Sequence, residues 1–216
     1  MSLKLRGFFS WEKSQVMTIL YLMNRGDIME SKRELKKRQN RQSMIEAALL
    51  LFSQKPFAEV SVRDIAKLAE VSPALIYKYF DDQQHLFLIA MQQENEKLIT
   101  ELKKYDTIES LSQGYLIYFF SNNTLYKMMT YFMISPNNES VSTIIVDEMN
   151  QLYNLFKENI MKLGHIKNPQ QETGLLFSTL NGFLITYQNL PVFTNEHALN
   201  KTLSLLALYL ERFEKN

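Results

Sequence analysis

The sequence predicts an all-α protein in which a three-helix helix-turn-helix domain precedes a helical bundle. Apolar residues recur at helical spacing along most of the chain, and Val, Ile and Thr form none of the alternating runs that are typical of strands. The 216 residues include only six Gly and five Pro, which are too few for the many tight turns of an all-β fold. We expect three parts, covering residues 1–30, 31–82 and 83–216.

The composition excludes several classes of protein. With 46% hydrophobic and 22% charged residues, the chain has the make-up of a globular protein with a substantial core. It contains no Cys, and therefore no disulfide, thiolate metal site or Cys nucleophile. No apolar run approaches the roughly 20 residues of a membrane-spanning helix, so we expect no membrane partner.

The sequence also lacks the linear motifs of catalysis and metal binding. His85, His165 and His197 are scattered without the spacing of a zinc site, so we expect no metal and no cofactor. Neither a Walker phosphate loop nor a GxSxG nucleophile motif occurs. We therefore do not expect an enzyme, although catalytic residues need not form a linear motif.

Charge is distributed unevenly along the chain. The net charge is only +1, but residues 1–80 hold 14 Lys and Arg against 8 Asp and Glu, a net of +6. Residues 81–216 hold 10 against 15, a net of −5. The first part can therefore approach phosphates, although a chance asymmetry on a solvated surface would look the same.

Residues 1–30 form an N-terminal extension unlike the rest of the chain. The apolar run 16–23 after basic residues weakly resembles a signal peptide, but it is short and is followed by a poor cleavage site, so we do not expect secretion. Residues 25–29 back-translate readily to AGAGGTGATATTATG, a purine-rich ribosome-binding site ahead of a start codon. We hypothesise that Met29 is the natural start and that residues 1–28 are translated leader, which mass spectrometry of the natively expressed protein would test.

The predicted helices begin after the basic stretch 30–41. The first helix has an apolar face between residues 44 and 52, and Pro56 ends it. Ser61 with Asp64 three residues later resembles a capping box, with Asp in place of the usual Glu or Gln, and starts a second helix. The residues of this second helix that we expect to face inward are Ile65, Leu68 and Ala69.

A third helix is predicted to follow, with Ser72 as its N-cap and Pro73 at its first position. We expect it to continue from Ala74 to Phe80, so that two helices of about two turns are separated by Glu70-Val71. This arrangement is a helix-turn-helix, whose second helix lies in the major groove of DNA.

The third helix carries side chains suited to DNA. If Leu75 or Ile76 packs inward with Phe80, the residues facing outward, at least in part, are Ser72, Pro73, Ala74, Tyr77, Lys78 and Tyr79. Tyrosine hydroxyls and lysine can bind phosphates, while small residues let a helix approach the bases. The alternative is that Tyr77 and Tyr79 are ordinary core aromatics of a helical bundle.

A long helix over about 83–104 is predicted to follow, capped by Asp81 and Asp82. The remaining helices are expected at about 107–121, 123–134, 139–163, 169–188 and 195–214.

Residues 38–91 contain a pattern that resembles a known DNA-binding domain. The matching segments are Ile45-Glu46-Ala47-Ala48, Leu51-Phe52, Val62-Arg63-Asp64-Ile65-Ala66, Val71-Ser72, Ile76-Tyr77-Lys78-Tyr79-Phe80 and Leu86-Phe87. In that order they resemble the DNA-binding domain of the TetR (tetracycline-repressor-like) family. The resemblance covers about a quarter of the chain, and it implies a dimeric repressor whose C-terminal domain binds a small molecule and then releases DNA.

Two positions depart from the family pattern. Glu70 stands in the turn where the family often has Gly, and it fits there only if its backbone avoids strained angles. Gln83 stands where the family commonly has a Lys that contacts phosphate, and an amide lacks the charge assistance. We therefore expect Arg38 and Arg41 to supply much of the phosphate attraction. The full predicted DNA-binding set is Arg38, Arg41, Ser61, Arg63, Ser72, Pro73, Ala74, Tyr77, Lys78, Tyr79 and Gln83.

The C-terminal part is rich in aromatics and Met. Most of these side chains are core, as aromatic residues at helical spacing usually are. Met and Tyr together also suit an adaptable apolar pocket with polar anchors. We expect a small apolar or aromatic effector, and the candidate lining residues are Tyr118, Tyr126, Tyr131, Phe132 and Tyr153.

The last two predicted helices have the pattern of a dimer interface. Two such helices from each subunit can form a four-helix bundle, and Gly174 and Gly182 allow close approach. The alternative is that they only cover the core of one subunit. The predicted interface residues are Leu175, Leu176, Thr179, Phe183, Leu199, Leu203, Leu206 and Leu210.

The function expected from these features is that of a cytoplasmic, homodimeric regulator that binds a double-stranded DNA operator. Repression is implied by the resemblance, and activation stays open. The competing expectation is a helical ligand-binding or adaptor protein with weakened DNA binding, which Glu70, Gln83 and the Asp81-Asp82 pair would favour.

Overall fold

The computed structural model describes residues 32–134, 139–188, 192 and 194–214. The predicted extension 1–30, with its proposed start at Met29, lies outside the described residues. The chain divides into two units between Met44 and Ile45.

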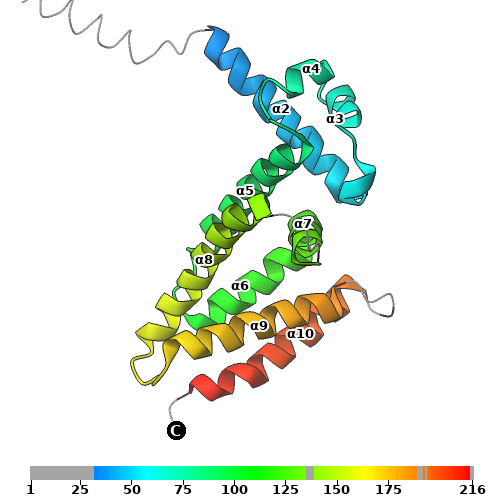
Figure 1. The fold of residues 1–216 in the computed structure, drawn as a ribbon. Coiled ribbons are helices and arrows are strands. Elements are labelled where there is room, and N and C mark those ends of the chain that lie inside the picture. The colour runs from blue at the N-terminus through cyan, green and yellow to red at the C-terminus, as the bar shows by residue number, and fades with distance from the viewer. Residues whose placement is uncertain (1–31, 135–138, 189–191, 193, 215–216) are drawn as a thin grey trace, which may run out of the picture. The chain divides into compact units, whose positions relative to one another are not determined.

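The described residues are helical and contain no strand, which confirms the all-α prediction (Figure 1). The elements are α2 (Lys32–Gln54), η1 (Phe57–Glu59), α3 (Val62–Leu68), α4 (Pro73–Ile76), α5 (Gln83–Leu102), α6 (Ile108–Ser121), α7 (Asn123–Ile134), α8 (Glu139–Lys162), α9 (Pro169–Tyr187), α10 (Asn195–Leu210) and η2 (Glu211–Phe213). The helices expected from residue 83 onward agree with these bounds to within two residues, apart from the last, which ends as the 3-10 turn η2.

Short polar side chains set where the bundle helices begin. Thr107 caps α6 in a capping box with Ser110. Asn168 caps α9 ahead of Pro169, and Thr194 caps α10. Each side chain accepts a hydrogen bond from a main-chain N–H that has no partner within its own helix, which stabilises the helix by about 1 kcal/mol.

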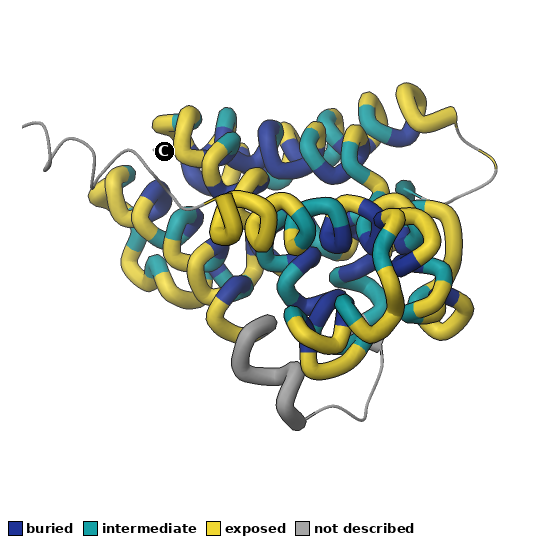
Figure 2. The backbone as a smooth tube through the Cα atoms, turned by 90° about the horizontal axis from the view of Figure 1, so that it is seen from above, coloured by how far each residue is buried: buried dark blue, intermediate teal, exposed yellow. Residues whose placement is uncertain are grey.

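Helix α6 is central to the bundle, since it packs against α5, α7, α8, α9 and α10. Its fully buried Tyr115 illustrates the packing. The ring lies edge-on to Phe156 of α8 at 5.6 Å between centroids, and the hydroxyl donates to Asn181 Oδ1 of α9 at 3.1 Å. Figure 2 shows the buried residues gathered on the faces where the helices meet.

A second contact of α6 depends on a glycine. A Cβ built on Gly114 would stand 2.3 Å from Cε2 of Tyr105, a separation that no real Cβ adopts. Gly114 is therefore required for the Tyr105 ring to lie against α6.

A polar pair joins α5 to α8 inside the bundle. The side-chain amide of Asn95 donates to the carboxylate of Glu148, and both residues are buried. Because a buried polar group without a partner is costly, this pair fixes how the two helices face each other.

In the part of the chain that the structure describes, no helix is long and apolar enough to cross a membrane. The same residues bring together no group of three or more His, Cys, Asp or Glu that could hold a metal ion.

Candidate functional site

The start of α3 follows the sequence prediction. Ser61 Oγ accepts from the main-chain N–H of Asp64 at 3.2 Å, and Asp64 Oδ2 accepts from the Ser61 N–H at 3.1 Å. The capping box with Asp in its third position is therefore confirmed. The hydrogen bonds from Ser61 lower the pKa of the Asp64 carboxyl, since they favour its charged form.

The turn between α3 and α4 places Glu70 in a strained backbone conformation. Its φ is +54°, in the left-handed region, so the condition for Glu to fit there without strain is not met. The cause lies in how α3 ends: Val71 N–H donates to Ala66 O at 2.9 Å and Glu70 N–H to Lys67 O at 3.3 Å. This pair of bonds is a Schellman motif, which requires a left-handed residue at the position of Glu70.

Helix α4 begins as predicted but is shorter. Ser72 caps it by accepting from the Leu75 N–H at 3.2 Å, and Pro73 is its first residue. The α-helix ends at Ile76 rather than Phe80, because the chain tightens into a turn in which Tyr79 N–H donates to Ile76 O at 2.9 Å. Tightened last turns are common where aromatic residues lower helix propensity.

The α4 segment presents a solvent-facing surface. Ile76 and Phe80 are almost wholly buried and anchor the segment. On the other side, Tyr77 is 56% exposed, which rules out the alternative that it is a core aromatic. The other exposed residues of the segment are Ser72, Pro73, Ala74 and Lys78, while Tyr79 is half-buried.

Helix α3 adds to this surface, and here one packing prediction fails. Leu68 was expected to face inward with Ile65 and Ala69, but it is 44% exposed while the other two are buried. Arg63 is exposed, as expected. Lys67 is exposed too, and no sequence signal had distinguished it from an ordinary surface lysine.

Three predicted DNA contacts have roles within the fold. The hydroxyls of Ser61 and Ser72 serve as helix caps. The amide of Gln83 donates to the carbonyl oxygens of Val60 at 2.5 Å and Phe57 at 3.4 Å. In this arrangement both amide hydrogens of Gln83 are used inside the protein, which sequence reasoning had not foreseen.

The start of α5 carries the two acidic residues seen in the sequence. Asp82 caps the helix, accepting from the His85 N–H at 2.7 Å. Asp81 does not cap it; its carboxylate lies 3.2 Å from His85 Nδ1 and its side chain is largely exposed. The expectation of two capping aspartates is therefore right for one of them.

Arg38 and Arg41 lie on α2, in the unit that ends at Met44, and both are exposed. Their contribution to phosphate binding stays a prediction.

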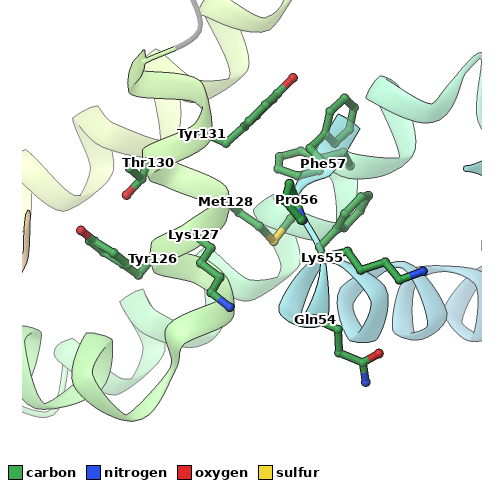
Figure 3. A pocket seen from close by; sticks show the side chains of 11 residues that line it. Gln54, Lys55, Pro56, Phe57, Tyr126, Lys127, Met128, Thr130 and Tyr131 are labelled. Atoms are coloured by element: carbon green, nitrogen blue, oxygen red, sulfur yellow. The ribbon is translucent and has the colours of Figure 1, made fainter. Parts of the chain in front are cut away.

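A cavity of about 430 Å³ lies where the end of α2 and the following corner meet α5 and α7 (Figure 3). Two predicted effector residues, Tyr126 and Tyr131, help to line it. The full lining is Phe52, Gln54, Lys55, Pro56, Phe57, Phe87, Tyr126, Lys127, Met128, Thr130 and Tyr131.

The other predicted effector residues do not line this cavity. The hydroxyl of Tyr153 donates to Gln170 O at 2.6 Å, which ties α8 to α9. Tyr118 is half-buried on α6. Its burial, and to a smaller extent the negative charges of Glu94 and Glu101, raise the pKa of its hydroxyl to about 12. The side chain of Phe132, on α7, lies outside the described residues.

The predicted interface residues fall into two groups. Leu176, Leu206 and Leu210 are buried within the single subunit, so they belong to its own core. Leu175 is exposed. The remaining predicted interface residues are partly exposed, and they are Thr179, Phe183, Leu199 and Leu203. Sequence reasoning missed two apolar residues that are more exposed than any of these, Ile185 at 60% and Leu208 at 64%.

Comparison with known proteins agrees with this geometry. Residues 44–89 match the family model for bacterial regulatory proteins of the tetR family. This match contains all of α3 and α4 and the beginning of α5. No curated protein matches the sequence.

Solved structures share the fold. A transcriptional regulator from Aquifex aeolicus VF5 is 17% identical, over 79% of this chain and 99% of its own, with a TM-score of 0.65. FadR from Bacillus subtilis, in complex with stearoyl-CoA, is 19% identical over 76% and 96%, with a TM-score of 0.62. NalD, the secondary repressor of the MexAB-OprM multidrug efflux pump in Pseudomonas aeruginosa, is 17% identical over 80% and 96%, with a TM-score of 0.56.

Proposed function

We propose that the protein is a homodimeric repressor, because residues 44–89 match the tetR-family model and the chain shares the fold of solved transcriptional regulators. It binds a double-stranded operator in the cytoplasm, and a small apolar effector releases it.

The observation that carries this proposal is the exposed face of the α4 segment. Ile76 and Phe80 are fixed in the core, while Pro73, Ala74 and Tyr77 face solvent. A one-turn helix held this firmly can enter the major groove with small residues nearest the bases. Arg63, Lys67 and Lys78 are exposed around it and supply positive charge for the phosphates.

Dimerisation is supported by exposed apolar residues on the last two helices. Leu175 and Ile185 on α9 and Leu208 on α10 are all about half exposed or more. Gly182 has no neighbouring atom within 4 Å of a built Cβ, so a second helix can approach it closely. Two copies related by a twofold axis would bury these residues and present two α4 segments to successive half-sites.

Repression and effector release are supported by the structural relatives. NalD is named as a repressor, and FadR was solved with stearoyl-CoA, a ligand with a long apolar chain. The cavity lined by Phe52, Phe57 and Phe87 offers an apolar surface for a ligand of related character.

A gel-shift assay with DNA from beside the protein's own gene tests the proposal. The variant Tyr77→Ala/Lys78→Ala should lose binding, while light scattering still reports a dimer. Lys103→Ala, which changes an exposed lysine on the far end of α5, should bind as the unmodified protein does. Affinity should fall steeply with salt, since each phosphate contact releases counterions. Equal binding by the double variant, or a flat salt response, would contradict the proposal.

A second candidate function is a helical ligand-binding protein with weakened DNA binding. It is favoured by Gln83, whose amide is used inside the protein, and by the negative charge of Asp81 beside it. A folded dimer that binds ligands but shifts no DNA would support this candidate.

A further inference from the structure

The cavity of about 430 Å³ is built from two segments that are far apart in the sequence. One is the corner between α2 and α3, with Gln54, Lys55, Pro56 and Phe57; the other is α7, from Tyr126 to Tyr131. Figure 3 shows Met128 and Lys127 of α7 facing this corner. The volume falls within the range of small-molecule sites.

Aromatic rings form most of the apolar wall. Phe57 lies 4.8 Å from Phe87 and 4.9 Å from Tyr131, measured between ring centroids. Phe52 packs edge-on against Phe87 at 4.7 Å. These contacts make a connected wall, against which an apolar chain or ring loses its contact with water.

The charged residues of the lining are both lysines. Lys55 and Lys127 belong to it, and no Asp or Glu does. Lys127 Nζ donates to the main-chain carbonyl of Ser53 at 2.9 Å. An ammonium group has three donor hydrogens, so Lys127 can also donate to an anion in the cavity.

We propose that this cavity binds an apolar carboxylate, with its tail against Phe52, Phe57 and Phe87 and its carboxylate at Lys127 and Lys55. This inference depends on the proposed function in one respect only, which is that the apolar carboxylate is identified with the effector. A lining that contains two lysines and no Asp or Glu favours a negative head group over a neutral or cationic one.

The position of the cavity indicates how its occupant acts on the DNA-binding segment. The corner residues Pro56 and Phe57 lead directly to Val60 and to Ser61, the cap of α3. A carboxylate at Lys127 also competes for the ammonium that holds the Ser53 carbonyl. Binding therefore changes the contact between the end of α2 and α7. Because α3 is joined to this corner of the chain, its position changes with that contact.

Calorimetry on the full chain without DNA tests the binding. The probes are decanoate, decanol and decyltrimethylammonium, each below its micelle concentration. Decanoate should bind about tenfold more tightly than decanol, since charged hydrogen bonds to Lys127 add to the apolar contacts.

Variants of the two lysines make the test specific. Lys127→Gln should weaken decanoate binding about tenfold and decanol binding hardly at all. Lys55→Glu should weaken decanoate about fivefold and strengthen decyltrimethylammonium. Lys103→Glu, a charge reversal of an exposed lysine away from the cavity, should leave all three affinities unchanged.

Each outcome decides the proposal. Preference for decanoate, lost in the two lysine variants and kept in Lys103→Glu, supports it. Absence of decanoate binding overturns the proposal. This holds even if the cause is that another part of the chain, or a second copy of it, fills the cavity. Equal affinity for decanoate and decanol, or identical behaviour of all three variants, overturns it as well. Because these measurements contain no DNA, a failed gel shift would reject the proposed function without deciding this inference.

Discussion

The side-chain amide of Gln83, at the first turn of α5, donates to the main-chain carbonyl of Val60 at 2.5 Å. Val60 is buried and immediately precedes the cap of α3. One side chain therefore links the long helix α5 to the segment that introduces the helix-turn-helix. Gln83, which was predicted from the sequence to contact DNA, therefore has a structural role.

Replacement of Gln83 by Ala should destabilise the protein by about 1–2 kcal/mol, because the Val60 carbonyl would lose the side-chain donor of a part-buried hydrogen bond. Chemical denaturation measures this change. Gln83→Lys keeps a donor and should lose less. If Gln83→Ala unfolds at the same denaturant concentration as the unmodified protein, the bond to Val60 does not contribute as described.

Replacement of Glu70 by Gly should stabilise the protein by about 1 kcal/mol, since its φ of +54° is costly for a residue with a Cβ. Thermal unfolding of Glu70→Gly and Glu70→Ala separates the causes. Both substitutions remove the negative charge, but only Gly removes the backbone strain at this positive φ. Equal melting temperatures for the two variants would show that charge, not backbone strain, governs this turn.

Replacement of Gly114 by Ala should destabilise the bundle by about 1–3 kcal/mol, because the new methyl group would stand 2.3 Å from the Tyr105 ring and force it to move. In a Tyr105→Ala background the same change should be neutral or stabilising, since Ala is the better helix former. A similar loss of stability in both backgrounds would mean that the added methyl group clashes with a residue other than Tyr105.

Tyr118 should give the protein a distinct alkaline transition. Burial and nearby carboxylates raise its pKa to about 12 in the folded chain, against about 10 when unfolded. The folded state therefore holds the phenolic proton more tightly, so this contribution to stability is complete below pH 10 and is lost as the pH rises toward 12.

Ultraviolet titration should show one tyrosinate forming near pH 12 in the native protein and not in Tyr118→Phe. Unfolding measured between pH 10 and 12 should depend less on pH in this variant. Identical alkaline slopes for the two proteins would mean that Tyr118 ionises in the folded state as it does in water.

Local interactions of the DNA-binding domain could be predicted from sequence. The Ser61–Asp64 capping box and the Ser72–Pro73 helix start involve residues within three positions of each other, so the sequence pattern alone contains them. The exposure of Leu68 and the use of the Gln83 amide depend on segments more distant in the chain. Helical periodicity carries no information about such contacts.

The residues that line the cavity of about 430 Å³ show the same division between local and distant contacts. Tyr126 and Tyr131 could be proposed because aromatic residues crowd α7. Lys55 and Phe57 come from the corner after α2, about 70 residues earlier, and nothing in their own surroundings indicates that they meet α7. Leu176 and Leu206 were misplaced for a related reason: apolar spacing on a helix does not distinguish the core of one subunit from a surface between two.

The central position of α6 has a kinetic consequence. Five helices pack around it, so unfolding its buried middle requires breaking contacts with most of the bundle. Hydrogen–deuterium exchange should be slowest along α6 and should there report the global unfolding free energy of the bundle. The short α4, exposed on one face, should exchange through smaller local openings, so the segment that we propose to enter the DNA groove is free to adjust while the bundle stays intact.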